Sequence, residues 1–201
     1  MMPISRFLKY ASVVLFGLFL VSCESDYTKA VKAGLATGVR RDSTLFGIKL
    51  GSTREEFYGT CFDLNKQKLV TQGVGFSVQY DFVDSITQSK PTPVRLMFYP
   101  GFDTLNVINA MNVEFTYPGW SPGIRELQSD SLSRHVKRIL KTWYGGNDFV
   151  SVEINKQEVP VKVDGNRRIL VFTEDDRRVL VRMQDMSHPE YLPKGMTVHT
   201  K

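Results

Sequence analysis

The sequence predicts an α+β fold, in which an antiparallel sheet of about six to eight strands carries two helices on one face. Several apolar runs alternate with polar residues at the period of two that is typical of strands. Two other segments repeat their apolar residues at helical spacing. The gaps between the strand-like runs are too short for the crossovers that parallel strands need. The order of elements is compatible with two αβββ halves, although no residue identity links them.

Length and composition favour a single globular domain. The chain has 201 residues, of which 42% are hydrophobic and 23% are charged. These values exclude collagen-like, fully disordered and disulfide-scaffold classes. The folded domain is expected at 44–201, preceded by a signal at 1–22 and a tether at 23–43.

The first 22 residues have the pattern of a secretory signal. Arg6 and Lys9 precede the apolar stretch Ala11–Val21. At about 1.5 Å per residue this stretch would cover about 16 Å, which is too short to span a bilayer. A basic flank, a short apolar region and small residues at its end indicate a segment that is removed.

Leu20-Val21-Ser22-Cys23 resembles the lipobox of bacterial lipoprotein signals. The resemblance implies cleavage before Cys23, a thioether-linked diacylglycerol on its sulfur, and usually an N-acyl chain such as palmitate. Each buried methylene contributes about 0.8 kcal/mol, so two or three chains anchor a protein where one does not. The membrane is thus the first expected partner. The expected location is the cell envelope. The outer membrane is favoured, and the protein could lie on either its periplasmic or its surface face.

Residues 23–43 are small and charged, which is typical of a tether, with a short helical segment expected at 27–35. Glu24 and Asp26 are similar to the acidic residues that follow the lipidated cysteine in surface-displayed Bacteroidota lipoproteins. The segment Phe46–Phe57 resembles the opening motif of small bacterial envelope lipoproteins, including uncharacterised Bacteroidota members and, more distantly, accessory lipoproteins of outer-membrane protein assembly. Those assembly proteins lack the second half of this chain, so no functional residue is carried over.

In the first half, Leu45, Phe46 and Ile48 predict a short strand at 44–49. Ser52 and Thr53 are each followed three residues later by a glutamate, which predicts a capping box and a helix. The apolar face of this helix carries Phe57, Cys61 and Leu64. Three alternating runs then predict strands, at 76–82, 94–98 and 107–117.

The second half opens with a Pro- and Gly-rich corner at 117–123. Ser129 or Asp130 is expected to cap the strongest helix, whose apolar stripe is Leu132, Val136, Ile139, Leu140 and Trp143. Its polar face carries Arg134, Lys137, Arg138 and Lys141. Strands follow at 149–154, 159–163, 168–172 and 178–183, with a type I′ turn expected at 164–166 and a charged turn at 174–176.

Charge and cysteine content exclude some function classes. Loss of Arg6 and Lys9 with the signal lowers the formal charge from +5 to +3, which does not indicate a nucleic-acid partner. Once Cys23 is acylated, Cys61 has no intramolecular disulfide partner, and its place on an apolar helix face favours burial over a nucleophilic role.

No residue pattern predicts a metal, a cofactor or a catalytic residue. The three histidines fit no zinc motif, and His135 is expected to be solvated on the polar helix surface. The acids near 164–166 and 174–176 are better explained by turns than by calcium. Trp143 is expected in the core, whereas Trp120 and Tyr117 in the Pro/Gly corner are the best candidates for ligand contact.

The sequence therefore favours a lipid-anchored, non-enzymatic binding or accessory module for another envelope protein or a surface ligand. The alternative is a carboxylate-dependent hydrolase of peptidoglycan or polysaccharide, for which the sequence singles out no carboxylate pair. A carrier of apolar ligands is a third hypothesis, and it requires a cavity.

Overall fold

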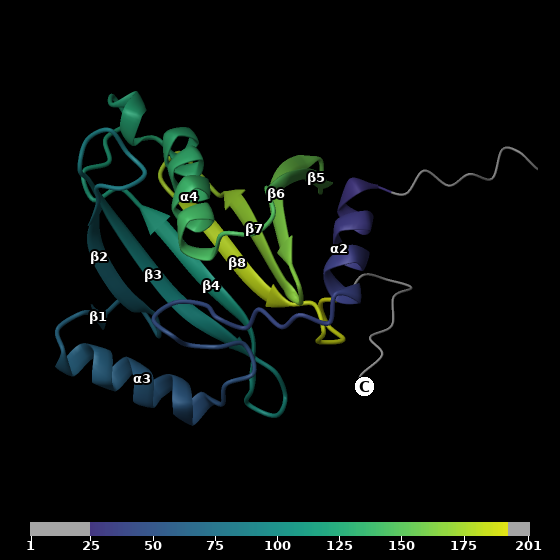
Figure 1. The fold of residues 1–201 in the computed structure, drawn as a ribbon. Helices are drawn as coiled ribbons and strands as arrows, with labels where there is room; N and C mark the ends of the chain where they lie inside the picture. The colour runs from purple at the N-terminus through teal and green to yellow at the C-terminus, as the bar shows by residue number, and fades with distance from the viewer. Residues whose placement is uncertain (1–24, 193–201) are drawn as a thin grey trace, which may run out of the picture.

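A computed structural model describes residues 25–192, which form one eight-stranded antiparallel sheet with three α-helices (Figure 1). The elements in chain order are α2 (Asp26–Ala36), α3 (Arg54–Lys66), β1 (Thr71–Gln72), β2 (Val78–Asp84), β3 (Thr92–Phe102), β4 (Ile108–Thr116), η1 (Arg125–Leu127), α4 (Ser129–Tyr144), β5 (Val150–Ile154), β6 (Gln157–Asp164), β7 (Arg167–Thr173) and β8 (Val179–Asp185). The predicted α+β class and the antiparallel sheet are confirmed. Cys23 and the signal segment lie outside the described residues.

The strand order is β1-β2-β3-β4-β8-β7-β6-β5. Strands β1–β4 and β5–β8 therefore form two meanders, in which each strand pairs with its neighbour in sequence. The meanders join through β4 and β8, where Val113 lies opposite Val181. Short connections explain the antiparallel pairing within each meander, but the β4–β8 junction joins segments far apart in the chain.

The helices do not all lie on one face of the sheet. Helix α4 packs over β4, β7 and β8, and α3 adds Phe57 to the same buried cluster. Helix α2 packs against β5 and β6 with a second cluster that contains Val31. On β7, Val171 belongs to the first cluster and its neighbour Leu170 to the second, so α2 and α4 cover opposite faces.

The segment expected as a tether is packed against the sheet over much of its length. Val31 is fully buried, and a Cβ atom on Gly34 would lie only 2.8 Å from the carbonyl oxygen of Gly165. The packed region therefore begins with α2, well before Thr44.

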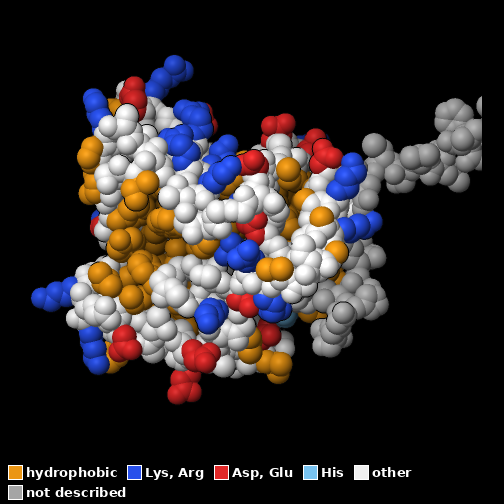
Figure 2. Space-filling view, viewed as in Figure 1, with side chains coloured by type: hydrophobic (Ala, Val, Ile, Leu, Met, Phe, Trp, Pro, Cys, Tyr) orange, Lys and Arg blue, Asp and Glu red, His pale blue; other side chains and the backbone are white. Residues whose placement is uncertain are grey.

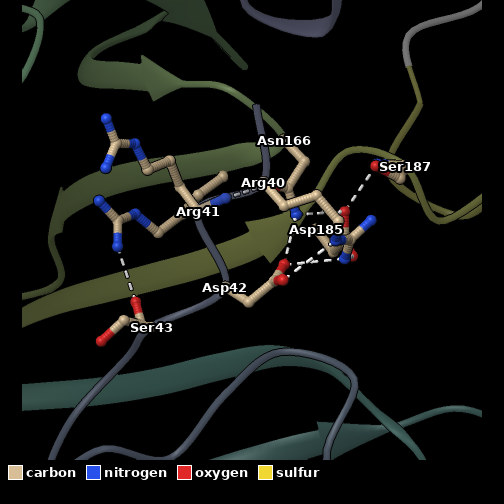
Figure 3. A network of polar contacts seen from close by, with 8 residues as sticks. Arg40, Arg41, Asp42, Ser43, Asn166, Asp185 and Ser187 are labelled. Carbon is tan, nitrogen blue, oxygen red and sulfur yellow. Dashed lines mark hydrogen bonds and ion pairs between the residues drawn. The ribbon is translucent and has the colours of Figure 1, made fainter. Parts of the chain in front are cut away.

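A polar network holds residues 40–42 to the end of the sheet (Figure 3). The backbone N–H of Arg41 donates to Asn166 Oδ1 at 2.6 Å, and Asn166 Nδ2 donates to carboxylate oxygens of Asp42 and Asp185 at 2.8 and 3.0 Å. Arg40 forms ion pairs with the same two carboxylates at 2.8 and 2.9 Å. Charge-assisted bonds of this kind fix the path of the chain before it enters the core.

The structure corrects two strand predictions, the strand at 44–49 and the start of the strand at 76–82. Residues 44–49 form a tight turn instead of a strand, with only an isolated bridge between Ser43 and Lys49. Phe46 has φ 53° and Gly47 has φ 79°, which end any extended run. Phe76 is 96% exposed in a turn, and β2 starts two residues later at Val78.

The helix caps and the hairpin turns match the predictions in part. Thr53 and Glu56 form the expected capping box, whereas α4 follows Gln128 without a side-chain cap. At the β6–β7 turn, Gly165 has a positive φ of 57° and Asn166 does not, which fits type II′ instead of type I′. No helix among the described residues is long and apolar enough to cross a bilayer.

Candidate functional site

An open groove of about 370 Å³ lies between the 43–46 turn, strands β2 and β3, and the last turn of α4. Its lining residues are Ser43, Thr44, Leu45, Phe46, Tyr80, Leu96, Trp143 and Tyr144. Figure 2 shows a broad patch of hydrophobic side chains on this face, below α4 and over the β2 side of the sheet. The volume is in the lower part of the range of small-ligand clefts.

Aromatic rings form a continuous row through this groove. Phe46 meets Tyr80 edge-to-face with ring centroids 5.0 Å apart, and Tyr80 stacks on Phe82 at 5.3 Å. Phe82 lies 5.8 Å from Trp143, whose side chain is 40% exposed. Such spacings are those of favourable aromatic pairs, so the row is preorganised while part of it stays open to solvent.

The 43–46 turn places Phe46 over the sheet. The turn is closed by backbone bonds from Thr44 N–H to Ile48 O at 2.8 Å and from Ile48 N–H to Leu45 O at 2.9 Å. Leu45 and Ile48 are buried on either side. A left-handed conformation at a phenylalanine costs of order 1 kcal/mol or more. The flanking buried residues and the ring contact of Phe46 with Tyr80 offset this strain.

A buried arginine fixes the opposite wall of the groove. Arg167 lies with its guanidinium carbon 4.3 Å from the ring centroid of Tyr144 and donates to the carbonyl oxygen of Ser43 at 2.7 Å. Tyr144 in turn donates its hydroxyl to the carbonyl oxygen of Thr44 at 3.0 Å. Burial raises the pKa of Tyr144 and lowers the pKa of Arg167. The wall is therefore held by polar bonds behind an aromatic surface.

The exposed face of α4 adds positive charge above the groove, where Figure 2 shows several basic side chains together. These are the four cations that the sequence placed on the polar face of the helix: Arg134, Lys137, Arg138 and Lys141. In the part of the chain that the structure describes, only Lys141 has a carboxylate partner, Asp148. Arg138 instead donates to the carbonyl oxygen of Thr87 at 3.1 Å, just beyond the end of β2.

A buried chain of three titratable residues lies beneath α4. His135 Nε2 lies 2.6 Å from Asp84 Oδ2, and His135 Nδ1 lies 2.9 Å from the hydroxyl of Tyr117. His135 has no exposed surface, so its expected solvated position is wrong. Its place next to Val136, three residues after Leu132, extends the apolar stripe of the helix. That spacing is the signal that could have identified it.

The surroundings of Asp84, His135 and Tyr117 shift the pKa of each of these groups. Burial lowers the pKa of His135, although the Asp84 carboxylate opposes this effect. Burial would raise the pKa of Asp84, but hydrogen bonds from Thr87, His135 and the Ile86 amide outweigh it and lower the pKa to about 2. Burial raises the pKa of Tyr117 to about 12. A neutral His135 that donates to Asp84 and accepts from Tyr117 satisfies all three groups.

The hydrogen bonds that join Asp84, His135 and Tyr117 follow the order of a catalytic relay. Their burial instead indicates that they stabilise the packing of α4 on the sheet. All three side chains are buried, with exposed fractions of 7% or less. A relay activates a nucleophile that reaches substrate, and Tyr117 is shielded from solvent. The chain instead joins α4 to the ends of β2 and β4.

The residues that the sequence proposed for ligand contact do not share one surface. Tyr117 is buried, and its hydroxyl is engaged by His135. Trp120 is half-buried and donates its ring N–H to the carbonyl oxygen of Asp176 at 3.1 Å. Trp143, which was expected in the core, is instead the exposed tryptophan of the groove. The sequence could not place Trp143 beside Phe46, because the contact depends on the 43–46 turn.

Cys61 does not form a reactive group, and the acidic residues do not form a metal-binding group, in the part of the chain that the structure describes. Cys61 is half-buried against the main cluster, and burial raises the pKa of its thiol to about 11, which disfavours the thiolate. Among residues 25–192, no group of three His, Cys, Asp or Glu side chains lies close enough to hold a metal ion.

A second cleft of about 430 Å³ lies on the sheet face opposite α4. It contains two carboxylates, Glu114 and Asp175, with Arg178 between them at 3.7 and 2.8 Å. Burial raises the pKa of Glu114, although Arg178 opposes the effect. Burial also acts on Asp175, but bonds from the Arg177 amide and from Arg178 lower its pKa. The two carboxyl groups therefore differ in acidity within one cleft.

Comparison of the chain with family models, with curated proteins and with solved structures gave no significant match in any of the three.

Proposed function

We propose that this protein is a lipid-anchored module of the cell envelope that binds another envelope protein or a surface ligand, without catalysis, at the aromatic groove. The observation that carries the proposal is the row Phe46–Tyr80–Phe82–Trp143, whose rings are held by contact with one another and which stays partly open to solvent. Exposed apolar patches of this kind mark interaction sites, and Trp and Tyr dominate binding energy there.

The anchor is part of the same proposal and rests on the lipobox-like sequence at Cys23. Replacement of Cys23 by Ala is expected to abolish labelling with radioactive palmitate and to release the protein from membranes. A matched change of Cys61 to Ala should alter neither property. Persistent labelling of the Cys23 variant would show that the chain is not anchored in this way.

Site-specific photo-crosslinking tests the groove in intact cells. Benzoylphenylalanine at position 143 is expected to give one stoichiometric adduct with an envelope component. The control is the same group at position 99, because Tyr99 is a 49% exposed aromatic residue on the opposite face of the sheet. Equal adducts at both positions, or none at 143, would contradict a specific site in the groove.

The second candidate function is hydrolysis of peptidoglycan or polysaccharide, and the observation that favours it is the Glu114–Asp175 pair. In such a mechanism Glu114, with its raised pKa, would act as the acid and Asp175 as the base or nucleophile. The Glu114→Gln variant is then expected to lose release of reducing ends by at least 100-fold. Unchanged turnover, or no turnover in the wild-type protein, leaves the carboxylates as partners of Arg178 alone.

We also propose that the domain consists of two related halves, and the order of elements supports this. Helix α3 precedes the β1–β4 meander, and α4 precedes the β5–β8 meander. Each such half would be a helix with four strands, one strand more than the sequence suggested.

A further inference from the structure

Strand β2 has an outer edge that is largely without a strand partner. Strand β1 pairs with β2 only at Val78 and Gln79, whereas β3 pairs with β2 along its whole length. In the part of the chain that the structure describes, residues 80–84 therefore pair with one strand only. An exposed edge presents alternate backbone N–H and C=O groups that can accept an added strand.

This edge borders the aromatic groove. Tyr80 and Phe82 point to the groove face, and they belong to the row that includes Phe46 and Trp143. Side chains of neighbouring antiparallel strands lie about 4.5–5.5 Å apart where they are directly opposite. Every second side chain of a strand added to β2 would therefore lie against the aromatic row, and the others would lie beside Asp81 and Val83.

Positive charge lies at the end of this edge. Arg138 reaches the carbonyl oxygen of Thr87, just beyond β2, and Arg134 is one turn earlier on the same flank of α4. In the described part of the chain neither arginine has a carboxylate within ion-pair distance; Arg134 donates only to the Ser131 hydroxyl at 3.1 Å. The surface complements an acidic group next to an apolar extended segment.

We infer that the groove takes an extended segment of a partner protein, which adds as a strand to residues 80–84 of β2. The segment has apolar side chains at alternate positions facing the aromatic row and carboxylates at the end nearest Arg134 and Arg138. This inference rests on the proposed function, because it specifies how the groove holds its partner. The unpaired backbone of β2 supplies affinity, and the aromatic row selects apolar residues. The two arginines determine in which direction the segment lies along β2.

The test uses the full acylated protein in detergent micelles and synthetic ten-residue peptides. The parent peptide alternates Val and Phe with Thr and ends in three Glu residues. Its binding is expected to slow amide hydrogen exchange within 80–84 by at least tenfold, with no change in β5, the edge strand at the other side of the sheet. Two further peptides carry N-methyl groups on alternate backbone amides, one on each alternate set.

Strand addition predicts that one methylated peptide binds like the parent and the other binds at least 30-fold more weakly. Only one alternate set of amides faces the β2 edge. The Trp143→Ala change should weaken the parent peptide at least tenfold. The Arg134→Glu change should weaken it about tenfold at low salt and much less at 0.5 M salt, while the control Lys156→Glu, on the β5–β6 turn, should have no effect.

Three results would overturn the inference. Equal binding of both methylated peptides, with position 143 still crosslinking in cells, leaves the groove as a binding site but excludes strand addition. Anionic phosphatidylglycerol vesicles that protect the groove when no peptide does would assign the surface to lipid. Absence of peptide binding together with absence of crosslinking at 143 would remove the proposed function as well.

Discussion

His135 holds α4 to two strands at once, and its replacement tests this residue-scale tie. The His135→Ala change leaves the Asp84 carboxylate buried without its 2.6 Å partner. Loss of the hydrogen-bond partner of a buried polar group typically costs about 1–3 kcal/mol, and more when that group is charged, as Asp84 is. We expect the free energy of unfolding, measured by urea denaturation, to fall by about 3 kcal/mol. The exposed neighbour Arg134→Ala should change it by less than about 0.5 kcal/mol.

The same residues predict how stability depends on pH. The pKa of His135 is lower in the folded protein than its ordinary value of 6.5, so the unfolded chain binds more protons below that pH. Stability should therefore fall as the pH drops below about 6.5, until the folded pKa is passed. Asp84, with a pKa of about 2 against 3.8, adds a second loss of about 2 kcal/mol between those values.

Urea denaturation at a series of pH values would check this dependence. In the His135→Gln variant the loss that starts near pH 6.5 should disappear, because no group titrates at that position. The more acidic loss should be reduced but still present, since Thr87 and the Ile86 amide continue to bond Asp84. An unchanged profile in the variant would show that His135 does not contribute to the dependence.

At the scale of elements, α3 depends on its capping box. The Thr53 hydroxyl accepts from the Glu56 amide at 3.2 Å, and the Glu56 carboxylate accepts from the Thr53 amide at 2.7 Å. The Thr53→Ala change is expected to lower the free energy of unfolding by about 1 kcal/mol, measured by thermal or urea denaturation. Ser52→Ala, one residue earlier, is the control and should have a smaller effect.

Elements with strong local patterns could be predicted from the sequence. The capping box at Thr53 and the apolar stripe of α4 depend on residues three or four apart, and the alternation of β3 on residues two apart. The 44–49 turn could not be predicted, because its apolar residues fit a strand equally well. Its left-handed Phe46 is stabilised by Tyr80, which is distant in sequence.

The groove itself depends on contacts that no local pattern contains. It joins a turn near residue 45, strand β2 and the end of α4, so its formation requires the whole first meander and the helix of the second. The sequence singled out both tryptophans but misjudged Trp143, which is 40% exposed instead of buried in the core. Trp143 continues a helical stripe and yet lies at the rim, because α4 ends where the aromatic row reaches the surface.

At the scale of the whole molecule, Gly165 couples the N-terminal segment to the sheet. A Cβ atom there would collide with the carbonyl oxygen of Val39, whereas Gly38, which also has a positive φ, has no atom within 4 Å of such a Cβ. Gly165→Ala should therefore displace residues 37–43 and accelerate tryptic cleavage at Arg40 and Arg41. Gly38→Ala should incur only the backbone strain and leave cleavage slow. Equal cleavage rates in the two variants would contradict the coupling.

The packing of α2 against the sheet limits how far the folded domain can lie from Cys23. Ser25, which caps α2, is two residues after Cys23, and two residues span at most about 7 Å. If Cys23 carries the lipid, the β5–β6 end of the sheet stands almost on the bilayer. Strand β2 is five strand spacings from β6, a distance of about 24 Å across the sheet. The rigid sheet would then set the distance between the end of the domain next to the membrane and a partner bound at β2.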